Sequence, residues 1–209
     1  MKIAVFGATG GTGRQVVRQA LQKQHTVTAF ARSPEKAGPA REGLTVIKGD
    51  VLEPDAVARA VDGQDAVICV LGATAGKAGR VRSEGTRHIL AAMEKAGVRR
   101  FLAQSTIGMG ETAPMLGFKY RRLLVPLLLR ATFEDTARQE ALILESDLDW
   151  TIVRCGALNN GERTGNYAHG DDPPESKIKG KISRGDAADF LLAQLTDDKF
   201  VRHAVWLSY

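Results

Sequence analysis

A glycine-rich turn near the start of the chain constrains its fold more than any other feature. The turn, Gly7-Ala-Thr-Gly10-Gly-Thr-Gly13, lies between the short apolar run 2–6 and a stretch whose apolar residues recur at helical spacing. Glycines allow a tight turn, let the backbone approach a pyrophosphate, and let the helix pack close to the strand, while the helix N-terminus favours negative charge. This strand-turn-helix context predicts nucleotide binding, with a purely structural turn as the alternative.

Strand and helix patterns alternate along the rest of the chain. We expect strands at 2–6, 26–31, 44–48, 65–71, 99–104, 150–153 and 204–207. We expect helices after the glycine turn and at 54–61, 83–96, 134–145 and 183–195, the last opened by a capping box of Ser183 and Asp186. This alternation predicts an α/β fold: a single-domain, Rossmann-type, doubly wound parallel sheet flanked by helices and covering residues 1–209.

Length and composition favour an intracellular globular protein. The 209 residues suit one compact unit, and no apolar run approaches the roughly 20 residues that span a bilayer. The N-terminus lacks a signal-peptide pattern, so a cytoplasmic location is expected. Cys69 and Cys155 both lie in apolar stretches and are expected to be buried free thiols.

The net charge of +5 does not indicate nucleic-acid binding, because the basic residues are spread along the chain without interleaved aromatic residues. Neither a nucleic acid nor a membrane is expected as a partner. Two local excesses of basic residues are either solvated faces or sites for a small anionic ligand. They comprise Lys119, Arg121, Arg122 and Arg130, and Lys177, Lys179, Lys181 and Arg184.

The end of the second predicted strand indicates which dinucleotide is bound. Where NAD-binding proteins carry an acidic residue for the ribose 2′-hydroxyl, this chain has Arg32 followed by Ser33. An arginine offers a planar cation to a 2′-phosphate, and no carboxylate repels it. Lys36 either reinforces this site or is a solvated lysine. NADP is therefore the expected cofactor.

Three further strand ends carry candidate site residues. Asp50, in Gly49-Asp50-Val51, is a candidate partner for the adenine or a simple turn carboxylate. The sequence Leu71-Gly72-Ala73 ends the fourth strand at the edge where such sheets bind ligands. Ser105 ends the fifth strand, where a nicotinamide would lie, and is the candidate catalytic residue, with a local structural hydroxyl as the alternative.

These motifs, together with Gly63-Gln-Asp-Ala-Val-Ile68, Ser83-Glu-Gly and Leu148-Asp-Trp-Thr-Ile-Val-Arg154, resemble the atypical short-chain dehydrogenase/reductases. Within that group the chain resembles the flavin reductase (biliverdin reductase B) branch most, followed by NmrA-like proteins. The resemblance implies an NADPH-dependent reductase of flavins such as FMN and riboflavin, or of linear tetrapyrroles such as biliverdin. It implies cofactor contacts at Gly7, Thr9, Gly10, Thr12, Arg32, Lys36, Asp50, Val51, Leu71, Gly72 and Ser83, to which the surrounding motifs add Gly11, Gly13, Ser33 and Ala73, and an active-site serine at Ser105. The chain departs from that branch at Ala157, where a histidine is expected, and at Cys155, where many relatives have proline.

The chain lacks the Tyr-x-x-x-Lys pair with which related enzymes protonate an alkoxide, because Tyr120 and Tyr167 are followed four residues later by Leu124 and Asp171. We therefore predict direct hydride transfer to a planar anionic acceptor, with a proton from solvent and hydrogen bonding by Ser105. Residues 105–135 and 154–184 are expected to form the substrate region of a monomer. The four histidines are too scattered to predict a metal site. A redox sensor that binds NADP without turnover, as in NmrA-like proteins, is the alternative function.

Overall fold

The first three predicted strands form with the predicted bounds in the computed structural model, which describes residues 1–39, 41–72, 79–118, 120–172 and 178–209. The main sheet consists of β1 (Lys2–Phe6), β2 (Thr26–Ala31), β3 (Leu44–Lys48), β4 (Ala66–Cys69), β5 (Arg100–Thr106), β6 (Asp149–Cys155), β8 (Ala168–Gly170) and β10 (His203–Ser208). The helices are α1 (Gly11–Gln22), α2 (Pro54–Val61), α3 (Val81–Ala96), α4 (Arg130–Leu144) and α5 (Arg184–Ala193). Three shorter helical segments are η1 (Pro34–Ala37), η2 (Gly110–Met115) and η3 (Tyr120–Leu129).

The strand order is β3-β2-β1-β4-β5-β6-β10-β8, and every pair is parallel except β10 with β8. The order reverses at β1, which pairs with β2 on one side and β4 on the other. Ligands of open α/β sheets bind beyond the carboxyl ends of the strands at such a switch point. The fold therefore places the candidate site next to the glycine turn that follows β1.

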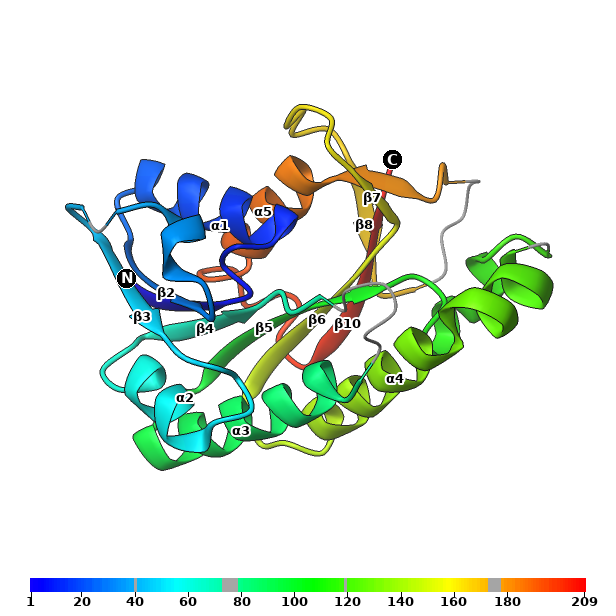
Figure 1. Cartoon of the computed structure of the whole chain (residues 1–209). Coiled ribbons are helices and arrows are strands. Elements are labelled where there is room, and N and C mark those ends of the chain that lie inside the picture. Colours follow the sequence, from blue (N-terminus) through cyan, green and yellow to red (C-terminus); the bar gives the residue numbers. More distant parts are fainter. Residues whose placement is uncertain (40, 73–78, 119, 173–177) are drawn as a thin grey trace.

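Helices cover both faces of the sheet, with α1 and α5 on one face and α2, α3 and α4 on the other (Figure 1). Each face has its own apolar core. Ile3, Val5 and Leu102 belong to the core beside α1 and α5, whereas Phe6 and Phe101 belong to the core beside α2 and α3. This two-sided burial confirms the doubly wound fold and explains the nearly continuous apolar runs of the central strands.

The structure departs from the predicted parallel sheet at one edge. Beyond β10, the last predicted strand, the sheet continues with β8, which the sequence analysis did not predict and which pairs antiparallel with β10. A second, two-stranded sheet pairs β7 (Ala157–Asn159) with β9 (Lys181–Ser183). A strand of three residues is too short to show hydrophobic periodicity in the sequence. Such strands are identified only by their pairing with segments distant in the chain. This small sheet carries the chain from β6 back to α5 at the edge of the candidate site.

Candidate functional site

A cleft of about 570 Å³ lies at the carboxyl ends of β1, β2 and β4. Its walls come from the glycine turn, the ends of these strands, the start of α3 and the start of α5. Eleven predicted cofactor residues line it, namely Gly7, Thr9, Gly10, Gly11, Thr12, Arg32, Lys36, Asp50, Val51, Leu71 and Gly72. The other lining residues are Arg14, Phe30, Ala31, Gly49, Val70, Val81, Arg82, Gln104, Leu158 and Arg184.

The backbone around the glycine turn leaves no room for a side chain at Gly7 or Gly13. Gly7 has a φ of +86°, and a Cβ there would lie 2.6 Å from the carbonyl oxygen of Val70. A Cβ on Gly13 would lie 2.0 Å from the carbonyl oxygen of Gly7, so α1 packs directly on the turn. Within the described residues no side chain caps the N-terminus of α1. Its first N–H groups and its dipole therefore suit an anionic group in the cleft, such as a pyrophosphate.

The cleft is strongly basic. Five of its lining residues are cationic and one, Asp50, is acidic; the cations are Arg14, Arg32, Lys36, Arg82 and Arg184. Arg32 follows the last residue of β2, and Lys36 lies one turn farther, in η1. This charge distribution fits a dinucleotide with three phosphate groups, because each phosphate can pair with a nearby guanidinium or ammonium.

Arg184 crosses the glycine turn from the opposite wall. A Cβ on Gly11 would lie 2.5 Å from its Nε, and its Nη1 donates to Asn160 Oδ1 at 2.7 Å. Among the described residues of the second basic excess, Arg184 lines the cleft. Its position depends on the β7–β9 sheet, so the sequence, which offered this excess either as a solvated face or as an anion site, did not place Arg184 at the glycine turn.

Asp50 lines the cleft, and its Oδ1 accepts a hydrogen bond from the Leu52 N–H at 3.0 Å in a local turn. Its predicted contact with the adenine stays a prediction. Val51 packs close to α3, where a Cβ on Gly85 would lie 2.8 Å from its methyl groups. The Ser83-Glu-Gly motif thus allows α3 to approach the cleft.

Four predicted cofactor residues are not among the residues that line the cleft. Gly13 packs beneath the turn, Ser33 lies outside the lining, and Ala73 falls outside the described residues. Ser83 is buried, and its hydroxyl donates to Asp135 Oδ1 at 2.6 Å. Its predicted contact with the cofactor stays a prediction.

Asp135, on α4, organises the start of α3. Besides the Ser83 hydroxyl, its carboxylate accepts the backbone N–H groups of Arg82 at 3.0 Å and Ser83 at 3.2 Å. These are N–H groups of the first helical turn, which have no partner within the helix. Asp135 therefore anchors the turn that carries Arg82 into the cleft. Burial lowers the pKa of Arg82, and the charges of Cys69 and Asp135 act in the opposite direction.

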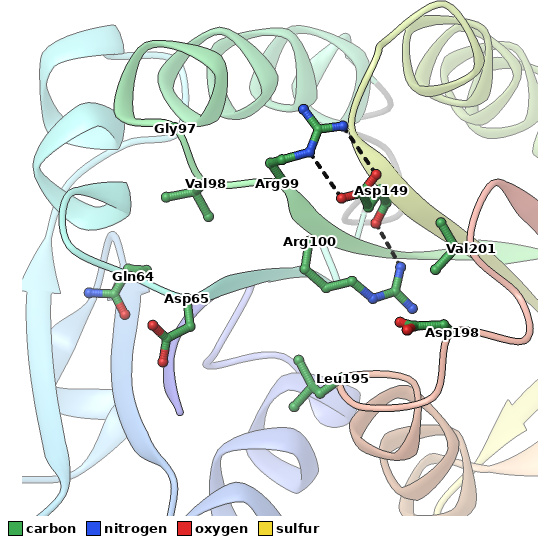
Figure 2. Close-up of a pocket in the computed structure, with 10 residues that line it drawn as sticks. All are labelled: Gln64, Asp65, Gly97, Val98, Arg99, Arg100, Asp149, Leu195, Asp198 and Val201. Carbon is green, nitrogen blue, oxygen red and sulfur yellow. Dashed lines mark hydrogen bonds and ion pairs between the residues drawn. The ribbon is translucent and has the colours of Figure 1, made fainter.

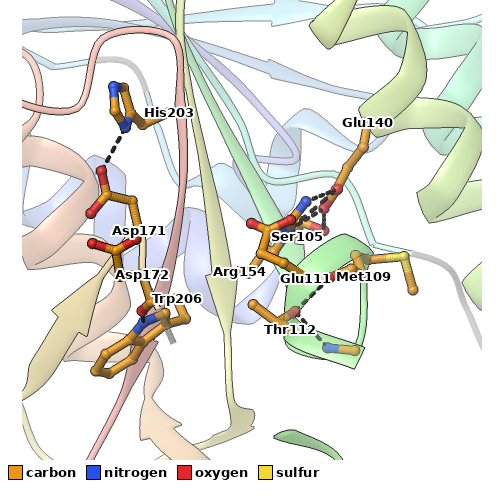
Figure 3. A network of polar contacts seen from close by, with 11 residues as sticks. Ser105, Met109, Glu111, Thr112, Glu140, Arg154, Asp171, Asp172, His203 and Trp206 are labelled. Atoms are coloured by element: carbon orange, nitrogen blue, oxygen red, sulfur yellow. Dashed lines mark hydrogen bonds and ion pairs between the residues drawn. The ribbon is translucent and has the colours of Figure 1, made fainter. Parts of the chain in front are cut away.

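Ser105 belongs to a buried polar network rather than to the cleft lining (Figure 3). Its hydroxyl donates to Glu140, which accepts Nη2 of Arg154 at 2.8 Å and Nε at 3.2 Å. The Arg154 and Glu140 side chains are 3% and 7% exposed. Burial alone would lower the pKa of Arg154, but hydrogen bonds and charge from Glu140 and Glu111 outweigh it and raise the pKa.

The network limits what Ser105 can do. Its single hydroxyl proton is directed at the Glu140 carboxylate, so toward any other group the oxygen can only accept a hydrogen bond. The neighbouring Gln104 lines the cleft instead, because successive side chains of β5 point to opposite faces. The catalytic role predicted for Ser105 stays a prediction, and this geometry does not favour proton donation.

A larger cavity, of about 790 Å³, lies at the other end of the sheet (Figure 2). Arg99 and Asp149 form an ion pair there, with Nε 3.0 Å from Oδ2. Arg100 donates to the carbonyl oxygens of Asp149 at 2.7 Å and Gln194 at 2.7 Å. Arg99, Arg100 and Asp149 are thus engaged with the protein itself, and none of the predicted site residues that the structure describes lies there.

Two tyrosine hydroxyls are held away from the cleft. Tyr167 donates to Asp189 at 3.1 Å, and Tyr209 donates to Asp186 at 2.5 Å. Burial and the charge of Asp189 raise the pKa of Tyr167. In the described part of the chain, no cluster of three or more histidine, cysteine or acidic side chains could hold a metal ion. Both cysteines are buried, as predicted.

Comparison with known proteins agrees with this geometry. A family model described as NAD(P)H-binding matches residues 7–198. The chain is 32% identical over 207 residues to an uncharacterised chloroplast protein of Arabidopsis thaliana, covering 95% of this chain and 73% of that protein. It is 30% identical to the photosystem II assembly factor Ycf39 of Synechocystis, covering 80% of this chain and 48% of the relative. A 3-diazoavenalumate denitrifying reductase of Streptomyces is 30% identical, with 87% of this chain and 64% of the relative covered.

Solved structures share the whole fold. The oxidoreductase YlbE of Lactococcus lactis has a TM-score of 0.85 at 25% identity, covering 100% of this chain and 90% of that one. ChuY, an anaerobilin reductase of Escherichia coli O157:H7, has a TM-score of 0.81 at 23% identity, covering 100% and 97%. A short-chain dehydrogenase/reductase of Veillonella parvula solved with NADP has a TM-score of 0.83 at 19% identity, covering 100% and 94%.

Proposed function

The chain belongs to the NAD(P)H-binding family, and from this premise we propose that it is an NADPH-dependent reductase of a flavin, such as FMN or riboflavin, or of a linear tetrapyrrole, such as biliverdin. The observation that carries the cofactor assignment is the basic cleft at the switch point of the sheet, with Arg32 at the end of β2. When bound, the reduced nicotinamide supplies a hydride from its C4 to flavin N5 or to the central methine bridge of the bilin.

The residues of the cleft support binding and orientation. The turn from Gly7 to Gly13 and the start of α1 would hold the pyrophosphate, while Arg32 and Lys36 would hold the 2′-phosphate. Residues 105–135 and 154–184 would supply the substrate region. Orientation of two planar groups is the main contribution that such a site can make to hydride transfer.

The lack of a proton donor supports a conjugated acceptor. No Tyr-x-x-x-Lys pair occurs in the sequence, and the Ser105 proton is directed at Glu140. An alkoxide product would need a protein acid, whereas a reduced flavin or bilin is a stabilised anion that water can protonate. ChuY, whose name describes an anaerobilin reductase, supports a bilin as one acceptor.

Turnover is tested by mixing the purified protein with NADPH and FMN, riboflavin or biliverdin, and following the absorbance of the reduced cofactor. We expect oxidation well above the spontaneous rate with at least one acceptor. If NADPH binds by calorimetry but no acceptor is reduced, the reductase proposal fails and a redox sensor that binds NADP without turnover replaces it. Ser105→Ala should retain hydride transfer within about tenfold, because general acid catalysis by a side chain typically contributes 10²-fold or more.

A further inference from the structure

Five large apolar side chains are exposed on and beside η3. They are Phe118, Leu123, Leu124, Leu127 and Leu128, and the last two are 75% and 76% exposed. Residues 123, 124, 127 and 128 recur at a spacing that places them on one face of a helix. In Figure 1, η3 continues outward from the start of α4 and projects beyond the sheet. Soluble monomers rarely expose a contiguous apolar patch of this kind without a binding role.

The charge around this patch identifies its partner. Residues 118–130 contain four basic residues and no acidic residue. The Arg122 guanidinium lies 5.8 Å from the centre of the Phe118 ring, whereas Arg130, whose side chain is 77% exposed, also forms an ion pair with Glu134 at 2.8 Å. Exposed leucines and a phenylalanine bordered by cations are the composition of segments that lie in the surface of an anionic bilayer.

We propose that η3 docks on an anionic lipid surface, with its leucines among the acyl chains and its cations at the headgroups. No helix in the described residues is long and apolar enough to cross a membrane. The ten residues of η3 would extend only about 15 Å at α-helical rise, half of the hydrocarbon core, so the segment would lie along the surface. A second copy of the chain fits less well, because pairing two such patches would bring like charges together.

This proposal departs from the expectation, drawn from the sequence, that no membrane is a partner. The sequence shows the basic residues and the leucines, but it does not show that the leucines are exposed rather than packed in the core. The proposal does not depend on the reductase activity: η3 lies within the segment 105–135 proposed as part of the substrate region, but none of its described residues lines the cofactor cleft, and the vesicle assay needs no turnover.

The test is cosedimentation of the full chain with vesicles of phosphatidylcholine and phosphatidylserine in equal parts, against vesicles of phosphatidylcholine alone. We expect binding to the anionic vesicles that weakens with added salt. Replacing Leu127 and Leu128 together by serine should abolish it, whereas Leu144→Ser, at a leucine 52% exposed on α4, should not. Replacing Arg122 with serine should weaken binding about fivefold, and Arg18→Ser on α1 should have little effect.

Three results would overturn the proposal. The first is no binding to the anionic vesicles, and the second is equal binding by the double leucine variant whose circular dichroism matches that of the parent chain. The third is self-association in gel filtration that the leucine changes abolish, since the patch would then be an interface between two copies.

Discussion

Glu140→Gln tests whether the buried network of Arg154 stabilises the fold. The change keeps the side-chain volume and one acceptor oxygen but removes the charge that Arg154 contacts at 2.8 and 3.2 Å. Removing one partner of a buried ion pair typically costs about 3–5 kcal/mol. Glu111, whose side chain is 52% exposed, still pairs with Arg154. We therefore expect Glu140→Gln to lose an amount of stability at the lower end of that range, about 3 kcal/mol. The total stability of a domain is roughly 5–15 kcal/mol, so this loss would be large enough to measure.

The measurement is urea unfolding followed by circular dichroism. Glu134→Gln is the matched control, because this residue lies on the same helix and pairs with Arg130 at the exposed surface. It should leave the midpoint nearly unchanged. Adding Arg154→Met to Glu140→Gln removes the uncompensated charge, so the double variant should lose less stability than the two single losses added together. A Glu140→Gln midpoint equal to that of the control, or strictly additive losses, would refute the reasoning.

Three further changes probe other parts of the molecule. Arg32→Ala should weaken NADPH binding by about 10- to 100-fold in calorimetry and leave NADH binding nearly unchanged, because a hydrogen bond to a charged group contributes about 1.5–3 kcal/mol. Equal losses of affinity for the two dinucleotides would contradict the role of Arg32 at the 2′-phosphate. Gly13→Ala should lower stability by at least about 1–3 kcal/mol in thermal unfolding and weaken dinucleotide binding, because the new Cβ would lie 2.0 Å from the Gly7 carbonyl oxygen. An unchanged melting temperature would contradict the close packing of α1 on the glycine turn. Burial would raise the pKa of Asp186, but hydrogen bonds from Tyr209, Gly165 and Thr164 outweigh it and lower the pKa. The stability that ionised Asp186 contributes to the fold is therefore fully present above the unfolded-state pKa of about 4 and is lost as the pH falls through the lower folded-state pKa. The difference in melting temperature between the parent chain and Asp186→Asn should accordingly narrow below about pH 4.

The two neighbours at the end of β5 show where sequence reasoning reached its limit. Gln104 and Ser105 both lie near the end of β5, which is buried on both faces. Polar and apolar residues therefore do not alternate along this strand, and the sequence does not indicate which of the two side chains faces the ligand. The structure turns Ser105 toward α4 and leaves Gln104 at the cleft. Glu140 and Arg154 are far from Ser105 in sequence, and although Arg154 ends one of the family-like motifs, no local pattern indicates that it pairs with Glu140.

Local patterns sufficed for other parts of the site. Arg32 and the glycine turn are recognisable because their predicted roles depend on position within one βαβ unit, where β1, the turn, α1 and β2 follow one another directly in the chain. Half of the predicted capping box also formed: the Ser183 hydroxyl accepts the Asp186 N–H at 2.9 Å, whereas the Ser183 N–H donates to the Tyr209 hydroxyl at 3.2 Å. Such features need only a few consecutive residues.

The sequence by itself determined the alternation of strands and helices, the nucleotide-binding turn and the basic strand end, because each depends on short-range spacing and backbone sterics. Only the tertiary structure decided that β8 extends the sheet, that Arg184 crosses the glycine turn, that Ser105 is bonded to Glu140, and that the leucines of η3 are exposed. These depend on contacts between segments distant in the chain, where packing of the whole domain selects among arrangements that local spacing permits equally.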